Sequence, residues 1–133
     1  MERLALKTAR RKELVDITGL VGEAVGRLGL ADGAVLVFVP HTTAGVTVNE
    51  GADPDVAHDL GGVLERLVPE YGPYRHAEGN SDAHAQALLT GPSCLLPVEG
   101  GAVRLGTWQR VFFCEFDGPR AREVWVQPLS PKE

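Results

Sequence analysis

The sequence lacks any long apolar run: its longest stretches of consecutive apolar residues, such as AVLVFV at 34–39, hold six residues or fewer. A helix that crosses a bilayer needs roughly 18 or more such residues in succession. The first residues, MERLALKTARRKE, also lack the apolar centre of a secretory signal. We therefore expect no membrane span and a cytoplasmic protein.

A concentrated run of positive charge is missing as well. Lys and Arg number 13 against 18 Asp and Glu, a formal charge of −5, and the basic residues are scattered apart from Arg10, Arg11 and Lys12. A nucleic-acid surface needs a positive stripe that displaces the counterions of the phosphate backbone. We therefore expect no nucleic-acid partner, and a small molecule as the ligand.

Cysteine is scarce. Cys94 and Cys114 stand in the apolar stretches SCLLPV and VFFCEF, and no CxxC pair occurs. This pattern favours two reduced, buried thiols over a disulfide or a thiolate metal site.

Common catalytic motifs are absent too. The chain contains no GxxxxGK[ST], GxGxxG, GxSxG or HExxH, which counts against a nucleotide-phosphate loop, an α/β-hydrolase and a zincin. A metal or phosphate site assembled from separate segments of the chain stays open.

The chain, at 133 residues and 44% apolar content, can bury one core but is too short for two ordinary domains. Apolar periodicity and capping residues predict about three helices. The first lies behind Thr18 and stops at Gly29, the second starts at Pro54 after Asp53 and ends at Pro69, and the third is capped by Asn80 or Ser81 and closed by Gly91.

Strands are predicted on both sides of these helices. The first two runs are compatible with a hairpin, AVLVFV suits a strand buried on both faces, and the last two runs are interpreted as a hairpin across DGPR. The absence of regular βαβ alternation predicts a single α+β domain over 1–133, with mixed or mainly antiparallel sheets packed by helices. The predicted strands cover 4–8, 13–18, 34–39, 46–49, 93–98, 98–106, 110–116 and 121–127.

Histidines are the first candidates for chemistry, since imidazole is a common metal ligand and near-neutral acid or base. His58 lies inside the second helix and is interpreted as a solvated residue. His76 lies in the polar loop YGPYRHAEGNS, and His84 lies in the first turn of the helix that follows. A loop that folds over this helix start could bring both rings to one metal ion or anion, although their spacing matches no standard zinc signature. Asp82 adds a carboxylate that an ordinary first-turn position also explains.

A second candidate cluster follows the apolar strand at 34–39. His41, Thr42 and Thr43 come directly after Pro40, where regular strand pairing should stop. The hydroxyl groups suit phosphate, and Asn49 and Glu50 could add an amide and a carboxylate. The alternatives are ordinary strand threonines and an Asn-Glu-Gly turn.

The last candidates surround the final pair of strands. Gln109 could contact a ligand or a subunit. Glu115 alternates with apolar residues and is expected on a buried face, so it needs a partner. Arg120 and Arg122 are candidates for that partner or for an anion site, while DGPR is also explained as a turn.

Three ordered blocks carry a family resemblance. HTTAGVTVNEGADPDV, YRHAEGNSDAHAQALLTGPS and GAVRLGTWQRVFFCEFDGPRAREVWV resemble successive blocks of the YjbQ family, also called the secondary thiamine-phosphate synthase family, over residues 4–129. The resemblance implies a β-sandwich-like α+β fold and a homotrimer with its sites near subunit contacts. It selects His41, Glu50 and Glu115 as catalytic residues, Thr42, Thr43, Asn49, Asn80, Gln109 and Arg120 as ligand-binding residues, and His76 and His84 as ligands of a divalent metal, Zn or Mg.

The implied reaction joins an aminopyrimidine pyrophosphate to a thiazole phosphate and releases pyrophosphate. Dedicated thiamine-phosphate synthases are TIM barrels, which take about 250 residues, so this chain is not one. The activity that the family resemblance implies is a weak one. Our leading hypothesis is a small, metal-assisted enzyme that acts on a phosphorylated compound, with His41 as an acid-base or anion-binding group. The alternatives are a non-catalytic trimer that binds a phosphorylated metabolite or a protein partner, and polar blocks that serve only as contacts between subunits.

Overall fold

The computed structural model describes residues 1–131, so the last two residues of the predicted domain lie outside it. Among these residues, none of the helices combines the length and the apolar composition that a membrane span requires. The elements follow in the order β1 (Glu2–Lys7), β2 (Glu13–Asp16), α1 (Thr18–Leu28), β3 (Gly33–Phe38), β4 (Ala44–Glu50), α2 (Pro54–Leu67), α3 (Ser81–Thr90), β5 (Ser93–Glu99), β6 (Ala102–Val103), β7 (Gln109–Glu115) and β8 (Ala121–Leu129).

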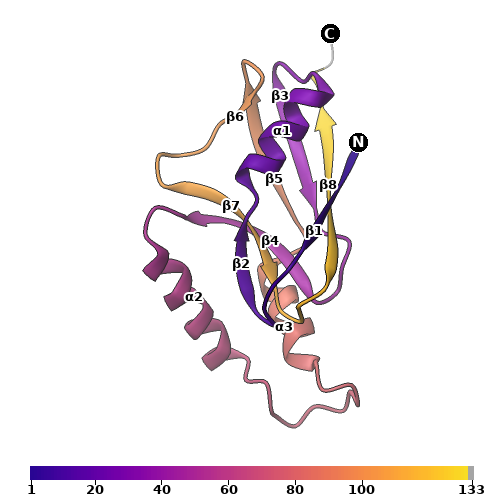
Figure 1. Ribbon diagram of the computed structural model, residues 1–133, viewed down its shortest axis with the longest axis vertical. Helices are drawn as coiled ribbons and strands as arrows, with labels where there is room; N and C mark the ends of the chain where they lie inside the picture. Colours follow the sequence, from indigo (N-terminus) through magenta and orange to yellow (C-terminus); the bar gives the residue numbers. More distant parts are fainter. Residues whose placement is uncertain (132–133) are drawn as a thin grey trace.

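The strands form two sheets, which confirms the predicted α+β class (Figure 1). One sheet has the order β1-β8-β3-β5-β6 and the other the order β2-β7-β4. Every strand pairing within residues 1–131 is antiparallel. The main core lies between the two sheets and α1, and a smaller cluster lies between the other face of β7 and α3.

Both predicted hairpins are wrong. Strand β1 pairs with β8 while β2 pairs with β7, so the first two strands belong to different sheets. Strands β7 and β8 are also divided between the sheets, and the DGPR segment crosses from one to the other. The physical reason is burial: β7 is buried from Val111 to Glu115 without alternation, so it must lie in the layer between the main core and α3.

The predicted burial of β3 on both faces is wrong, because only its inward face is fully buried. Val35 and Val37 are inaccessible, whereas Ala34, Leu36 and Phe38 retain partial exposure. The inward face meets the other sheet and α1. No helix of the described residues covers the outward face, because α1 and α3 pack elsewhere.

Helix α1 begins one residue earlier than its predicted cap implies. Ile17 occupies the N-cap position, because the hydroxyl of Thr18 accepts a hydrogen bond from the Val111 amide at 2.8 Å instead. That bond joins the helix start to β7. Gly29 ends the helix in the left-handed conformation, with φ of 69°, as predicted.

Helix α2 has its predicted boundaries but not a buried face. Asp53 accepts from the Asp55 amide at 2.9 Å, and Pro54 is the first helical residue. None of its residues is buried, and it lies beside the sheets in Figure 1. Its C-terminal end is held by Lys12, which binds Glu65 at 2.7 Å, and by the Gln86 amide, which donates to the Leu64 carbonyl at 3.2 Å.

The two cysteines are free thiols. Cys114 is buried, and Cys94 is half-buried. Burial raises the pKa of Cys94 to about 11 and, together with the neighbouring Cys94, that of Cys114 to about 12. Both groups are therefore protonated and unreactive near neutral pH.

Candidate functional site

A polar cleft of about 370 Å³ lies where the end of β3, the start of α3 and the β7–β8 link meet. Pro40 directs the chain out of the sheet after β3, and the polar loop before α3 folds back toward the same place. The link between β7 and β8 closes the third side. The lining residues are Pro40, His41, Thr42, Thr43, Glu78, Asn80, His84, Asp117, Arg120 and Arg122.

His41 is fixed by a backbone contact. Its Nε2 accepts a hydrogen bond from the Glu123 amide at 2.9 Å. The last pair between β3 and β8 is Phe38 with Trp125, so Glu123 lies beyond the part of β8 that pairs with β3. The imidazole supplies the acceptor that β3 would otherwise provide. Burial, and then the charge of Arg122, lowers the pKa of His41 below its ordinary value. The ring is therefore neutral near pH 7.

A buried ion pair forms the back of the cleft. The Arg122 guanidinium donates from Nε to Glu115 at 2.8 Å, and from Nη2 both to the second Glu115 oxygen and to the Thr43 hydroxyl, the latter at 2.9 Å. Thr8 also donates to Glu115, at 2.7 Å. The predicted need of Glu115 for a partner is thus met by Arg122.

The environment of Glu115 decides how it can act. Burial alone would raise its pKa, but the hydrogen bonds from Arg122 and Thr8 outweigh burial and lower it. A carboxylate held ionised by several donors is a weak proton acceptor. The geometry thus favours a structural part for Glu115 over the catalytic one predicted from the sequence.

Arg120 carries the exposed positive charge of the cleft. Its side chain is 51% exposed and donates from Nη2 to the Asp117 carboxylate at 3.0 Å. The same carboxylate accepts from the Asn80 side-chain amide at 3.0 Å. The Asn80 Oδ1 atom is buried and, within residues 1–131, has no hydrogen-bond partner.

His76 and His84 are neighbours, as their sequence positions suggested, with ring centroids 5.6 Å apart. His84 lines the cleft, and His76 is exposed in the loop. Within residues 1–131, no three His, Cys, Asp or Glu side chains are grouped to hold a metal. Asp82 is fully buried and bound to Arg11 and Lys12, so it is not available to the histidines.

The donor set indicates which metal would fit. Imidazole nitrogens suit zinc and other transition metals, whereas magnesium prefers oxygen ligands. The two imidazoles, with ring centroids 5.6 Å apart, would supply two ligands of a coordination shell. Other ligands would have to come from a bound molecule, water or another subunit.

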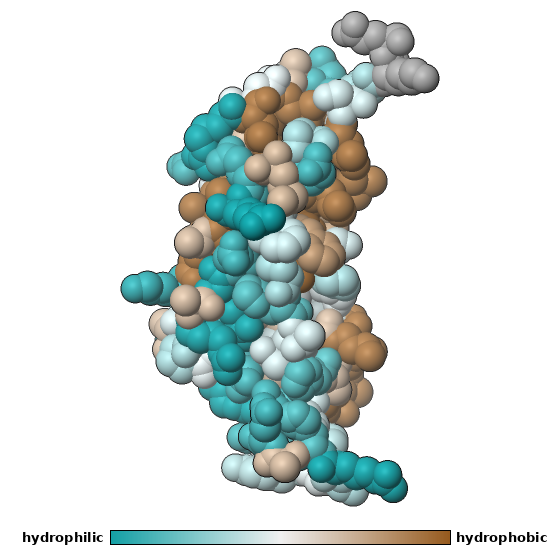
Figure 2. Space-filling model, turned by 90° about the vertical axis from the view of Figure 1, so that its right-hand side faces the viewer, coloured by the Kyte–Doolittle hydropathy of each residue, from teal (hydrophilic) through white to brown (hydrophobic). Residues whose placement is uncertain are grey.

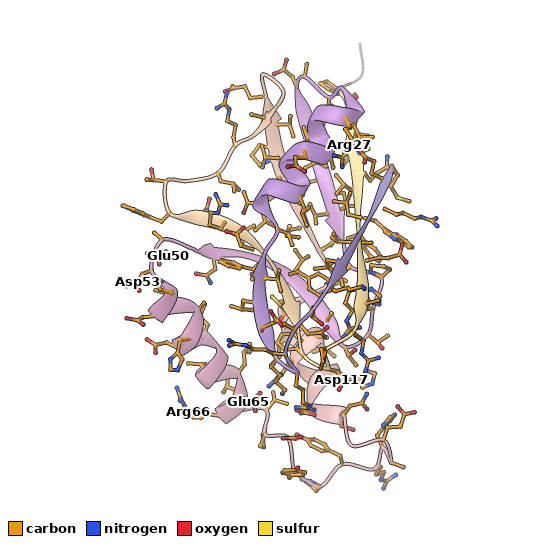
Figure 3. The ribbon with its side chains drawn as sticks, viewed as in Figure 1. Arg27, Glu50, Asp53, Glu65, Arg66 and Asp117 are labelled. Carbon is orange, nitrogen blue, oxygen red and sulfur yellow. The ribbon has the colours of Figure 1, made fainter. Side chains whose placement is uncertain are left out.

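Asn49, Glu50 and Gln109 do not reach this cleft. Ala44 pairs with Glu115 at one end of the β4–β7 ladder, and Glu50 pairs with Gln109 at the other. Six residues of extended chain span about 20 Å, so a single chain cannot gather both ends into one pocket. Figure 3 shows Glu50 beside the start of α2 and Asp117 far from it, near α3.

The polar groups at that far end have local partners. The Asn49 side chain accepts from the Glu50 amide at 2.7 Å, and Glu50 accepts from the Asp53 amide at 3.2 Å. Gln109 accepts from the Gly106 amide at 2.8 Å. These contacts explain the three residues as ends of strands that hold the adjoining turns. His58 is 87% exposed on α2, as predicted.

Sequence reasoning missed Glu78 and Asp117, which also line the cleft. Asp117 was attributed to the DGPR turn alone. The available signal is its position two residues after the buried Glu115 and three residues before Arg120, because an acid between two such groups can bind both segments. Glu78 gave no comparable signal in its polar loop.

The fold and the cleft together define a single-domain α+β protein with two antiparallel sheets and a polar pocket at their junction with α3. The family model described as UPF0047 protein YjbQ-like matches residues 2–130. The chain is 47% identical to a UPF0047 protein of Methanocaldococcus jannaschii, over 96% of this chain and 92% of the relative. It is 44% identical to YugU of Bacillus subtilis, over 98% of this chain and 99% of that protein.

Solved structures agree. A YjbQ/UPF0047 protein from Clostridium acetobutylicum is 49% identical, with a TM-score of 0.93 over 96% of this chain and 98% of that one. A conserved protein from Thermus thermophilus is 52% identical, with a TM-score of 0.91 over 97% and 100%. The chain therefore belongs to the YjbQ-like family, which confirms the resemblance noted in the sequence.

Proposed function

We propose that the cleft binds a small phosphorylated compound. The observation that carries this proposal is the convergence of His41, Thr42, Asn80, His84 and Arg120, which come from three separate segments, on one cavity. Its volume of about 370 Å³ falls within the usual range for small-molecule sites, about 300–1,000 Å³.

The positive groups of the cleft could hold an anionic ligand, although Glu78 and Asp117 also line it. Arg122 is already neutralised by Glu115 in the buried wall. Half-exposed Arg120 donates to the carboxylate of Asp117 and, from Nε at 2.8 Å, to its backbone carbonyl, and it would exchange these contacts for a phosphate. The start of α3 adds the positive end of a helix dipole at the same cavity. Thr42 is exposed and adds a hydroxyl donor.

Calorimetric titration with pyrophosphate tests the proposal. We expect saturable binding by the wild type and a loss of about 10-fold or more in Arg120→Gln, because a charged hydrogen bond contributes about 1.5–3 kcal/mol. The matched control is Arg104→Gln, since Arg104 pairs with Glu99 outside the cleft and is 57% exposed. Absence of binding by the wild type, or equal weakening by both variants, would contradict the proposal.

The enzymatic form of this function is the thiamine-phosphate synthase reaction that the family resemblance implies. Both of its substrates carry phosphate, and His76 with His84 would supply two ligands to a transition metal that stabilises the departing pyrophosphate. Turnover that His84→Ala abolishes, with folding intact, would support catalysis. Pyrophosphate binding without turnover would support a non-catalytic binding protein instead.

We further propose that the chain forms the homotrimer that the resemblance implies. Leu67, Leu88 and Leu95 are 67%, 79% and 62% exposed, and Figure 2 shows apolar surface gathered along one edge of the view. Contiguous apolar surface, such as the edge in Figure 2, marks contact surfaces. Sedimentation equilibrium should give about three times the 14.2 kDa chain mass; a monomer mass at micromolar concentration would contradict the trimer.

A further inference from the structure

The backbone amide of Glu123 in β8 has no strand partner on the side of β3. Strand β8 pairs with β3 as far as Trp125 opposite Phe38, and extending that register by two residues would place Glu123 opposite Pro40. The chain leaves the sheet at Pro40, so the amide loses its strand partner. An unsatisfied backbone donor is costly, and the acceptor that replaces the strand is Nε2 of His41, at 2.9 Å.

We propose that the two ring nitrogens of His41 have separate functions: Nε2 completes the hydrogen bonding of β8, and Nδ1–H donates to the phosphorylated ligand in the cleft. The second half rests on the proposed function; the first does not. An imidazole that accepts at Nε2 must carry its proton on Nδ1, and the imidazolium form has no acceptor at all. Within residues 1–131, no hydrogen bond uses Nδ1.

The surroundings of the ring favour this neutral form. Burial and the nearby Arg122 both lower the pKa of His41, and the charges of Glu115 and Glu123 oppose them without reversing the shift. Of the two parts expected for His41, acid-base catalysis or anion binding, the contact favours the second. His41 cannot act as a general base through Nε2 while the strand contact holds, so its remaining chemistry is that of a neutral donor to an oxygen of the ligand.

Two substitutions separate the two nitrogens. In His41→Gln, the side-chain carbonyl reaches the place of Nε2, so it keeps an acceptor for the Glu123 amide but supplies no donor at the place of Nδ1. In His41→Asn, the shorter amide places a donor near Nδ1 and leaves the Glu123 amide without an acceptor. His58→Gln on α2 is the control, since that ring is 87% exposed.

We expect His41→Gln to keep its Tm within about 2 °C of the wild type and to bind pyrophosphate about 10-fold more weakly. His41→Asn should lose about 2–5 °C in Tm, because the Glu123 amide then has no acceptor. Nitrogen-15 spectra of the wild-type ring at pH 7.5 should show a proton on Nδ1 and none on Nε2.

The opposite outcomes overturn the inference. A proton on Nε2, or an undiminished Tm in His41→Asn, contradicts the strand contact. Pyrophosphate binding by His41→Gln at wild-type affinity contradicts the donor role. If the wild type binds no pyrophosphate, the proposed function fails together with the donor role, whereas the tautomer spectrum and the melting temperatures still decide the contact with β8.

Discussion

Arg122 on β8 and Glu115 on β7 form a buried ion pair between two strands that belong to different sheets, with side-chain exposures of 3% and 0%. The pair joins the sheets at the point where the chain crosses between them. It also anchors the Thr43 hydroxyl at the back of the cleft. The same contact therefore contributes both to fold stability and to the shape of the site.

Removing one partner of this pair should be strongly destabilising. We expect Arg122→Met to lower the free energy of unfolding by about 3–5 kcal/mol, because it leaves a buried carboxylate without its cation. The double variant Glu115→Leu, Arg122→Met should lose less than Arg122→Met alone. Urea unfolding measures both. Arg104→Gln, in an exposed pair, should change stability by less than about 1 kcal/mol, and a loss that small in Arg122→Met would contradict the assignment.

Stability should fall in acid because of Glu115 and Asp82. Burial tends to raise the pKa of each carboxyl, but Arg122 and Thr8 lower that of Glu115, and Arg11 and Lys12 lower that of Asp82. The unfolded chain then binds protons at a higher pH than the folded one, so the stabilisation is present above the ordinary values of 4.5 and 3.8 and is lost as the pH falls below them.

The acid dependence can be assigned by substitution. In Asp82→Asn, unfolding free energies measured from pH 7 down to pH 3 should decline less steeply than in the wild type. Arg104→Gln keeps both carboxylates and should follow the wild-type profile. An unchanged slope in Asp82→Asn would show that this carboxylate does not contribute.

Gly45 permits α3 to approach β4. A Cβ atom at this position would lie 2.7 Å from the Gly91 carbonyl oxygen and 3.1 Å from the Thr90 Cβ atom. Gly45→Ala should therefore cost about 1–3 kcal/mol of unfolding free energy. In contrast, Gly22→Ala in α1, where nothing lies within 4 Å, should stabilise the protein by about 0.5–1 kcal/mol. Equal effects of the two substitutions would refute this packing argument.

Metal uptake tests the histidine pair. We expect the wild type to bind zinc after equilibration and removal of excess metal, and His76→Ala and His84→Ala each to lose it, because their rings lie 5.6 Å apart. Elemental analysis gives the metal content directly. His58→Ala serves as the control on an exposed helix face, and zinc retained by both ring variants would place the metal elsewhere.

Much of the fold follows from local signals. The Asp53-Pro54 start of α2 and the Gly29 end of α1 depend on residues whose backbone preferences act within one turn. Sheet membership depends on distant partners instead. Alternation specifies which face of a strand is buried, but it cannot show that β7 pairs with β2 and β4 while β8 joins the other sheet.

The candidate site residues likewise include some that local sequence signals predict and some that depend on distant partners. His41, Thr42, His84 and Arg120 were predicted from their places near the ends of strands and helices, and Asn80 from the family resemblance. All of them line the cleft. Glu50 was grouped with them by sequence proximity, although six residues of extended strand carry it to the far end of β4. The contact between His41 and Glu123 spans 82 residues and depends on strand register, which the sequence does not reveal.

The adjacency of Arg122 and Glu123 on β8 has a consequence for folding errors. The first contributes its side chain to Glu115, and the second its backbone amide to His41. A slip of β8 by one residue would turn every side chain to the opposite face, so both contacts would be lost together. A molecule that binds His41 in the cleft would bind only the correctly aligned strand. Its binding would therefore stabilise the native register of β8 relative to the slipped registers.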